Sequence, residues 1–583
     1  MKQEDQKRDK WDNKVQAFLS LIGFAVGVAN FWRFPYMCQK NGGGTFLIPY
    51  AVMTLIIGFP LTYIELLVGQ KFQKGPLLAW GAISPYARGI GIASCICCCI
   101  GASYYAAVLG YSIFYFSNSF RSPLPWSQCP IIRNESNFTH AKVDPECSIA
   151  QPAVYYFYKE TLDATHSIND GGGIYWKAII CLAAGWIILY FCLMQGIKSS
   201  GKVVYVTATL PYVFLIAFLV RGMTLPGHEN GLAELIRPNI TALRNPYVWK
   251  DAAAQIFYSL GGGFGAYIAL GSYNPPQMKT ARYAVSVVLI NALTSLLAAT
   301  VVFSILGSSA TQIFNQCLKT ASVNPATFNG TEYGSCSMRK ILLSFGQGPG
   351  LAFIAFSTVL QQFHGAQVWS ALFFFMLFTM GIDSLFGIIE VVSTSVRDTR
   401  FFSRWPRQIV LALLCSLFFA IGLIVVQRSG GYYLEIADNH FIALALLVIA
   451  MSECIVVAFH DSYHRANPER TIMPSNDGRL PFRIVGLILA GVCILILTSV
   501  VIIVTYGIDT RFQYHAWVGK PIRTSAVPYP SWMVIVTIII MVISAIAVPL
   551  WALCTPIFRR IYPQSIETTT NDYSDVQRLS MAI

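Results

Sequence analysis

Several oxygen-bearing side chains lie within stretches of the chain that are otherwise apolar. Asn30, Ser259 and Asn291 are neutral, whereas Asp383, followed by Ser384, is an acid inside the run FFFMLFTMGIDSLFG. Oxygen ligands suit hard cations, and an ionisable residue within an apolar span marks a functional site by default. These residues predict a cation site inside a membrane, with the cation as the partner of Asp383.

Two of these stretches contain residues that interrupt a helix. GFAVGVANFWRFPY (23–36) holds Gly23, Gly27 and Pro35, and SLGGGFGAY (259–267) holds four glycines in five positions. Each glycine costs about 1 kcal/mol relative to alanine in a helix. Close helix packing is an alternative, but it explains one glycine pair better than four glycines. We expect two discontinuous helices, because bare backbone within a membrane is tolerated where it lines a cavity and freed carbonyls can bind a cation.

The composition requires a membrane protein around these residues. Of 583 residues, 55% are hydrophobic and 12% are charged, whereas a soluble protein carries about 25% charge. Crossing the hydrocarbon core takes about 20 apolar residues. We predict an all-α polytopic protein with twelve spans, at about 14–38, 44–71, 88–119, 174–195, 202–222, 248–275, 281–308, 366–397, 406–427, 431–460, 481–507 and 531–557.

The excess of basic residues predicts the orientation of these spans. The net charge is +13, but the lysines and arginines are dispersed and flank the spans, which argues against a nucleic-acid partner. Cytoplasmic loops of membrane proteins collect Lys and Arg, so we expect both termini in the cytoplasm. Four glycosylation sequons fall in loops that this rule assigns to the outside: Asn134, Asn137, Asn239 and Asn329.

The two interrupted spans, the first and the sixth, begin two consecutive sets of five. Paired interruptions at corresponding positions indicate a secondary transporter built from inverted repeats. We expect a cytoplasmic tail (1–13), a first five-helix repeat (14–222) with a large extracellular loop (120–173), a second repeat (248–460), helices 11 and 12 (481–557) and a cytoplasmic C-terminal tail (558–583).

The cysteines fit the same topology. Most of the 15 lie within spans, including the cluster Cys95 and Cys97–Cys99, where small buried apolar residues are expected. Outside loops face an oxidising compartment, which favours disulfides. We predict a Cys129–Cys147 disulfide, and a second one between Cys317 and Cys336.

Other classes of function fit less well. Neither a nucleotide-binding loop, nor paired catalytic carboxylates, nor a metal cluster is recognisable, so we do not expect an enzyme. Four-glycine loops can line channel pores, but rings of charged residues are absent from the sequence. A scaffold without transport activity would not need the cation ligands. A channel and such a scaffold remain the alternatives to a transporter.

Several motifs resemble one family. GFAVGVANFWRFPY, NGGGTFLIPY (41–50), AQIFYSLGGGFG (254–265) and GIDS (381–384) are similar to those of the neurotransmitter:sodium symporters, solute carrier family 6, from about Arg8 to the twelfth span. LPWSQCP (124–130), YYFYKETL (155–162) and VRGMTLPG (220–227) resemble the branch of epithelial neutral amino acid and imino acid transporters. The resemblance implies the fold of the bacterial leucine transporter, with helices 1 and 6 broken.

The resemblance also implies two sodium sites and a chloride site. The first sodium ion would be held by the carbonyl of Ala25, the side chains of Asn30, Ser259 and Asn291, and the substrate carboxylate. The second would be held by the carbonyls of Gly23, Val26 and Met380 and the side chains of Asp383 and Ser384. Chloride would lie among Tyr50, Gln255, Ser259, Asn291 and Ser295, because neutral Ser295 supplies no negative charge of its own.

The substrate pocket follows from the same resemblance. Carriers of monoamines have Asp where this chain has Gly27, so we expect a zwitterionic α-amino acid that brings its own carboxylate to the sodium ion and to the hydroxyl of Tyr105. The pocket would include Ala25, Ser259 and Ser384, and its side-chain part would be lined by Gly101, Tyr258, Gly261, Phe264, Gly387 and Ile388. Three glycines predict a roomy apolar space for a medium or large neutral side chain, or for a ring such as proline.

The gates complete what the resemblance implies. Arg33 and Asp438 resemble an outer ion pair above the lid of Tyr105 and Tyr258. Arg8 and Asp398 resemble an inner pair, supported by Trp11, Tyr273 and Glu390, and Glu65 would brace the broken helices by accepting backbone N–H bonds.

The expected function is a sodium- and chloride-dependent symporter of neutral amino acids in the plasma membrane. Glycine, GABA, betaine or another amino-acid-like solute is the alternative cargo. The epithelial branch also implies a single-pass ancillary membrane protein as partner.

Overall fold

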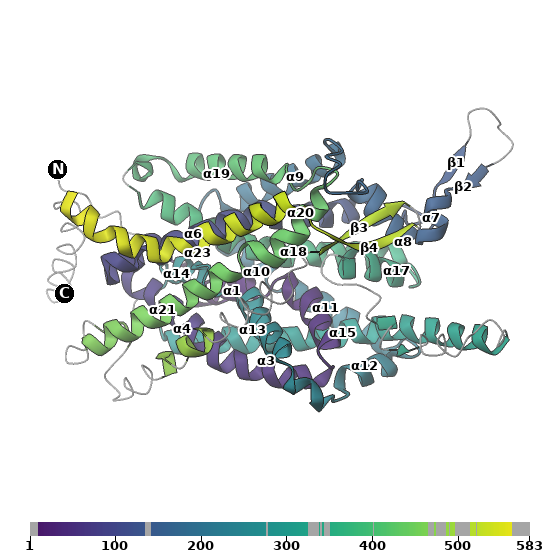
Figure 1. Ribbon diagram of the computed structural model, residues 1–583, viewed down its shortest axis with the longest axis horizontal. Helices are drawn as coiled ribbons and strands as arrows, with labels where there is room; N and C mark the ends of the chain where they lie inside the picture. Colours follow the sequence, from purple (N-terminus) through teal and green to yellow (C-terminus); the bar gives the residue numbers. More distant parts are fainter. Residues whose placement is uncertain are drawn as a thin grey trace.

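The structure is a computed structural model that describes residues 10–133, 141–275, 278–323, 337–338, 341–342, 350–399, 401–464, 471–473, 486–488, 490–495, 513–519 and 522–561. The chain is a bundle of long helices with two small hairpins at one end (Figure 1). The first helices are α1 (Lys14–Ala25), α2 (Phe34–Lys40), α3 (Leu47–Met53), α4 (Phe59–Phe72), α5 (Pro76–Ile83), α6 (Arg88–Asn118), α7 (Pro145–Ala150), α8 (Pro152–Tyr155), α9 (Trp176–Leu193), α10 (Ile197–Thr207), α11 (Leu210–Met223) and α12 (His228–Ile236). The later helices are α13 (Pro246–Leu260), α14 (Ala266–Gly271), α15 (Thr280–Val323), α17 (Phe356–Leu360), α18 (Ala366–Arg397), α19 (Arg407–Gly422), α20 (Gly430–Ile436), α21 (Ala443–Tyr463) and α23 (Ser531–Ile561).

The length and apolar character of these helices fit a membrane bundle. Within the described residues, eight continuous helical stretches are long and apolar enough to cross a membrane: Gly44–Phe72, Pro85–Asn118, Trp176–Leu193, Ser199–Met223, Thr280–Lys319, Ala366–Arg397, Gly430–Tyr463 and Ser531–Pro556. A bent pair (the first span), the pair α13 and α14, the shorter α19, and 486–495 of the eleventh span match the other four predictions. The twelve-span prediction fits this architecture, although the seventh helix was expected to end near 308 and continues to Val323.

The first span is interrupted as predicted. Its first part, α1, ends at Ala25, and Val26 has non-helical dihedral angles of φ −94° and ψ 88°. The chain resumes in a π-helical turn, η1 (Ala29–Arg33), and continues as α2 at an angle of 46° to α1. The backbone between the two parts therefore offers carbonyls that are not used in a helix.

The sixth span is interrupted at its glycine cluster. Gly261, Gly263 and Gly265, between α13 and α14, have φ values of +68°, +85° and +72°. Glycine adopts this left-handed region without the steric cost that a Cβ brings. The N–H group of Gly263 donates a 2.6 Å hydrogen bond to Oε1 of Glu65 on α4. Glu65 thus accepts a backbone N–H bond at the break, as the family resemblance of the chain implied for this residue.

Helices far apart in the sequence enclose the two breaks. Helix α14 packs against α4 and α18, and α1 packs against α10, α15 and α18. The outer faces of the bundle are apolar and exposed, for example at Phe191 on α9, Leu417 on α19 and Ile543 on α23. Exposed apolar side chains of this kind are suited to lipid.

Both hairpins lie at one end of the bundle, where α7 and α8 also lie (Figure 1). Strands β1 (Ile131–Arg133) and β2 (Ala141–Val143) pair antiparallel within the large loop, as do β3 (Gln513–Gly519) and β4 (Ile522–Pro528) before α23. Trp517 of β3 is fully buried and donates a 2.7 Å hydrogen bond to Glu146 of α7. The hydrogen bond between His515 of β3 and Glu435 of α20 raises the pKa of His515. The second hairpin, which the sequence analysis did not predict, thus joins the large loop to α20.

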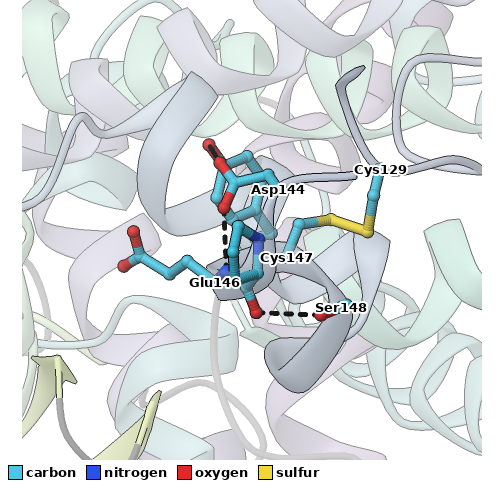
Figure 2. Close-up of a disulfide and its surroundings, with 7 residues drawn as sticks. Cys129, Asp144, Glu146, Cys147 and Ser148 are labelled. Atoms are coloured by element: carbon cyan, nitrogen blue, oxygen red, sulfur yellow. Dashed lines mark hydrogen bonds between the residues drawn. A yellow bond between two sulfur atoms is a disulfide. The ribbon is translucent and has the colours of Figure 1, made fainter. Parts of the chain in front are cut away.

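The disulfide between Cys129 and Cys147 is present, as predicted. Figure 2 shows it beside α7, where the side chain of Asp144 caps the helix by accepting a 2.8 Å hydrogen bond from the N–H group of Glu146. The disulfide closes the loop that contains the β1–β2 hairpin. Cys317 is also disulfide-bonded, and its predicted partner Cys336 lies outside the described residues.

The break in the sixth span gives a first prediction. Replacing Gly263 by alanine adds a Cβ at positive φ, only 3.2 Å from the carbonyl oxygen of Leu446. A left-handed non-glycine residue costs roughly 1–2 kcal/mol, so the Gly263→Ala protein is expected to melt at a lower temperature in detergent. Gly171→Ala is the control, since nothing lies within 4 Å of its Cβ position. Equal Tm values for the two variants would contradict the requirement for glycine at the break.

Candidate substrate and ion site

The two breaks face a single cavity of about 90 Å³. Its wall combines apolar and aromatic side chains with a few polar groups. The lining includes the predicted residues Gly27, Gly101, Tyr105, Tyr258, Ser259, Gly261, Phe264, Ser384 and Ile388, together with Phe24, Arg33 and Asp438. Mostly apolar pockets with a few converging polar groups are typical of small-molecule sites.

The neutral oxygen-bearing residues form one buried cluster beside the cavity. The amide nitrogen of Asn30 lies 3.0 Å from Ser259 Oγ and 2.7 Å from Asn291 Oδ1. Ser259 and Asn291 are hydrogen-bonded to each other at 2.8 Å, and Ala25, the last residue of α1, is fully buried. The structure brings together the residues predicted for the first sodium ion, and their role as ligands stays a prediction.

The residues predicted for chloride adjoin the same cluster. Ser295 Oγ accepts a 2.8 Å hydrogen bond from Asn30 and lies 3.5 Å from the hydroxyl of Tyr50. Gln255 donates to the carbonyl of Ala29 at 3.3 Å, and its Oε1 atom is buried without a partner among the described residues. Ser295 and Gln255 are both fully buried. The cluster therefore offers hydroxyl and amide donors, and within the described residues none of these hydrogen bonds involves an acidic side chain.

The second predicted sodium site lies on the other side of the first break. A Cβ added at Gly23 would be 2.7 Å from Oδ2 of Asp383, so this carboxylate faces the backbone of α1. Ser384 donates a 3.3 Å hydrogen bond to the carbonyl of Phe24. Val26 and Met380, whose carbonyls were predicted as further ligands, are both buried. Asp383 and Ser384 thus point at the carbonyls that the break frees.

Thr207 on α10 belongs to this second site and was missed in the sequence. Its hydroxyl donates a 2.6 Å hydrogen bond to Oδ1 of Asp383, which leaves Oδ2 facing Gly23. Thr207 lies within the stretch KVVYVTATLPY, where one hydroxyl residue carries no signal of its own. Only the packing of α10 against α18 makes the contact.

The prediction of a roomy pocket made by three glycines is wrong at two of the three positions. A Cβ on Gly261 would lie 2.5 Å from Phe24 Cζ, and a Cβ on Gly387 would lie 2.8 Å from Phe24 Cε2. The ring of Phe24 therefore occupies the space that both glycines leave, and it packs edge-on against Tyr267. Only Gly101 faces the cavity with room, since its nearest neighbour, Phe264 Cε1, is 3.7 Å from a Cβ position.

The residues predicted for the outer gate lie together. Arg33 and Asp438 form an ion pair with an N–O distance of 3.6 Å. The guanidinium of Arg33 lies 3.9 Å above the ring of Tyr258, and the Tyr258 hydroxyl donates to the carbonyl of Asp438 at 2.5 Å. All three residues line the cavity, and their role as a gate stays a prediction.

The residues predicted to support the inner pair lie together, since the ring centroids of Trp11 and Tyr273 are 6.0 Å apart and Tyr273 contacts Glu390. Asp398 accepts a 2.9 Å hydrogen bond from the N–H group of Gly75. Arg8 lies outside the described residues, so its pair with Asp398 stays a prediction. Glu390 accepts a hydrogen bond from Tyr273 and pairs with Arg407 at 2.6 Å. Arg407 was counted only as one of several positive loop residues, and its buried partner on α18 could not be recognised in the sequence.

The predicted glycosylation positions are only partly described. Asn239 is half-buried in a short turn, and its N–H group donates a 2.6 Å hydrogen bond to Thr45. Asn134, Asn137 and Asn329 lie outside the described residues. Glycosylation at all four positions stays a prediction.

Comparison with known proteins agrees with this geometry. The family model described as "Sodium:neurotransmitter symporter family" matches residues 8–558. The chain is 37% identical over 587 residues to the sodium-dependent neutral amino acid transporter B(0)AT2 of Mus musculus, which covers 94% of this chain and 79% of that protein. It is 35% identical over 590 residues to the sodium- and chloride-dependent transporter XTRP3 of Homo sapiens, which covers 96% and 98% of the two chains.

A solved structure shares the fold. The crystal structure of MhsT in complex with L-phenylalanine superposes with a TM-score of 0.64 at 22% identity, covering 84% of this chain and 99% of that one. Together with the two broken helices and the match over residues 8–558, these likenesses show that the chain belongs to the sodium:neurotransmitter symporter family.

Proposed function

We propose that this chain is a sodium- and chloride-coupled symporter of neutral α-amino acids that works by alternating access in the plasma membrane, with both termini in the cytoplasm. The observation that carries the proposal is the buried neutral cluster of Asn30, Ser259, Asn291 and Ser295 beside the cavity. Such a cluster can surround a sodium ion with oxygen atoms but supplies no negative charge. The similarity to B(0)AT2, named as a sodium-dependent neutral amino acid transporter, supports the same cargo.

The substrate carboxylate and a chloride ion would supply the missing charge. This chain has no acid at Gly27 that could pair with a substrate amine, and a Cβ there would lie 2.5 Å from Ser384 Oγ, so a larger residue requires Ser384 to shift. Asp438, the acid that lines the cavity, is paired with Arg33. An amino acid brings its own carboxylate to the ion cluster, whereas an amine does not. The name of XTRP3, a sodium- and chloride-dependent transporter, supports the chloride site among Tyr50, Gln255 and Ser295.

The second sodium ion would bind at Asp383. Oδ2 of this carboxylate and the Ser384 hydroxyl face the first break, and Thr207 holds the other carboxylate oxygen. An acid buried in a membrane protein favours a cation as its partner. Two sodium ions, one chloride ion and a zwitterionic substrate together carry a net positive charge. The single carboxylate of Asp383 would compensate it.

The cavity restricts the cargo to a compact neutral side chain. Phe24 fills the space beside Gly261 and Gly387, and the remaining wall at Gly101 is apolar. A charged side chain would be desolvated there without a partner. Compact side chains, including the ring of proline, fit the space, and glycine, GABA and betaine remain the alternative cargoes.

The repeats would move against each other during transport. We propose that residues 14–222 and 248–460 are the two inverted halves, each beginning with a broken helix. The Arg33–Asp438 pair would close the outer side, and the Arg8–Asp398 pair, with Glu390 and its partner Arg407 beside it, would close the inner side. Binding of a single-pass ancillary protein is proposed from the family branch alone.

Asn30 provides the test of the first sodium site. Asn30→Ala removes the amide that contacts Ser259, Asn291 and Ser295, so sodium-dependent uptake of neutral amino acids should be abolished. Asn230→Ala, at an exposed contact with Thr311, is the matched control and should transport normally. An unchanged apparent sodium affinity in Asn30→Ala would refute the assignment, and full uptake after complete sodium replacement would refute the proposed function.

Ser295 tests the chloride site. Ser295→Glu places a carboxylate where the chloride ion is expected, so uptake should become less dependent on external chloride because the negative charge is then built in. Ser295→Ala should keep the dependence on chloride. The comparison is uptake in chloride against uptake in gluconate, and equal chloride dependence of Ser295→Glu and the wild type would argue against an anion at this position.

Phe24 tests the size restriction. Phe24→Ala should shift the ratio of kcat/KM values toward larger side chains by about ten- to a hundredfold, as expected for space gained in an apolar pocket. Gly387→Ala should impair uptake in the wild type, because its Cβ meets the ring of Phe24, and should be tolerated when combined with Phe24→Ala. Competition by a panel of amino acids measures both effects. An unaltered preference in Phe24→Ala would show that the ring does not set the size.

A further inference from the structure

The β3–β4 hairpin contacts α20 through a histidine–glutamate pair. The carboxyl group of Glu435 on α20 has two contacts with His515 of β3: Nδ1 lies 2.8 Å from Oε1, and the backbone N–H group donates a 3.2 Å hydrogen bond to Oε2. The side chains of His515 and Glu435 are 49% and 25% exposed. Protons from the solvent can therefore reach the pair.

Tyr432 holds the hairpin one turn earlier on α20. Its hydroxyl accepts a 3.1 Å hydrogen bond from the N–H group of Trp517 and donates one of 2.5 Å to the carbonyl of Thr165 in the large loop. Its own carbonyl accepts a 2.9 Å hydrogen bond from the hydroxyl of Tyr529. The hairpin therefore contacts α20 at two positions, of which the one at Glu435 can change its charge.

The segment that the hairpin contacts leads directly to the predicted outer gate. Helix α20 ends at Ile436 and continues as a π-helical turn, η9 (Ala437–Phe441), which carries Asp438. Side chains three residues apart on a helix are neighbours, and the carboxylates of Glu435 and Asp438 interact electrostatically. Asp438 forms the ion pair with Arg33. A displacement of α20 would therefore move the acid of this pair.

The charge of His515 decides how Glu435 is compensated. A protonated His515 supplies a positive charge next to this carboxylate. A neutral His515 can keep a hydrogen bond but no longer offsets the negative charge. Like charges one turn apart on a helix repel each other, so an uncompensated Glu435 disturbs Asp438. Protonation of His515 therefore favours the pairing of Asp438 with Arg33.

We propose that His515 and Glu435 are positioning residues for Asp438, and that protons on the outer side thereby favour the closed outer gate. The inference rests on the proposed function, because it takes the Arg33–Asp438 pair as that gate. A protonated His515 holds the hairpin on α20 and keeps the gate pair together. Loss of this proton weakens the hold on α20, and the gate opens more readily.

Other titratable groups face the same region. They are Tyr158, His166 and Asp170 of the large loop, Asp438 on η9, and Tyr514 and Tyr529 at the hairpin. Burial raises the pKa of Tyr158 and of Tyr529, so both rings are neutral at physiological pH. Glu146 is paired with Lys159. His166, whose Nδ1 atom lies 2.9 Å from the carbonyl of Trp517, needs its own control.

Thermal unfolding of the purified full-length protein tests the pair itself. The hydrogen bond with Glu435 raises the pKa of His515 above its ordinary value of 6.5. The pair therefore stabilises the protein fully below that value, and its contribution is lost as the pH rises through the raised pKa. The difference in Tm between the wild type and His515→Gln should shrink between about pH 6 and about pH 8.5. In a Glu435→Gln background, His515→Gln should cause no pH-dependent change.

Two other histidines provide the matched controls. His166→Gln removes the neighbouring ring, and His228→Gln removes a ring that lies 2.7 Å from the carbonyl of Leu225. Both variants should keep the wild-type dependence of Tm on pH. A Tm difference for His515→Gln that does not change with pH, or a pH dependence that His166→Gln removes instead, would overturn the proposal.

Access to the cavity tests the effect on the gate. Val108 lines the cavity, so a Val108→Cys variant can report its opening through reaction with a membrane-impermeant thiol reagent added outside. The ratio of the rates at about pH 8 and about pH 6 should be about two- to fivefold larger with His515 than with His515→Gln, as expected for a partly exposed ion pair. Comparing these ratios cancels the pH dependence of the thiol itself. His515→Lys keeps its positive charge at both pH values and should react more slowly than His515→Gln.

The outcomes separate this inference from the proposed function. Equal rate ratios for His515 and His515→Gln would overturn the positioning role, even where the Tm values show the pair. The reaction is followed without sodium or substrate, so it does not depend on amino acid transport. Access that depends on pH through His515, in a protein without sodium-dependent uptake, would support this inference and contradict the proposed function.

Discussion

A helix that crosses a membrane must satisfy every backbone polar group within the protein, and this chain interrupts two such helices beside the same cavity. Nearby residues provide partners for the backbone groups that the interruptions free. The left-handed glycines let the chain turn between α13 and α14, and the carboxylate of Glu65 accepts the freed N–H group of Gly263. The carbonyls exposed at the first break face Ser384 and Asp383. The surrounding helices thus supply hydrogen-bond partners for the backbone groups at the two breaks, as the membrane interior requires.

The interruptions also explain the distribution of charge. The hydrogen-bonded cluster around Asn30 is neutral, whereas the predicted second sodium site has one acid, Asp383, which accepts a hydrogen bond from Thr207. Some charged side chains that are not predicted ion ligands form ion pairs, such as Arg33 with Asp438 and Arg407 with Glu390. Few uncompensated charges then remain in the interior, as the cost of burying a charge requires.

In the pocket, a single side chain reverses the size that was inferred from three glycines. Glycines at 101, 261 and 387 indicated space, yet the ring of Phe24 fills the space beside two of them. Phe24 lies in the first span, Gly261 in the sixth and Gly387 in α18. Their contact depends on how three helices pack, which no local pattern reports. The same holds for Arg407 and for the β3–β4 hairpin that joins the large loop to α20.

The sequence by itself determined the membrane class, the approximate span positions, the two broken helices and the oxygen-bearing residues beside them. These follow from local properties, since apolar length, glycine clusters and the placement of oxygen-bearing residues act along a short stretch of chain. The tertiary structure decided which residues lie beside the predicted sites: Thr207 beside Asp383, Phe24 in the pocket and Arg407 beside Glu390. Each of these contacts joins residues from different helices. Helix packing, unlike apolar periodicity, leaves no short-range pattern in the sequence from which it could be predicted.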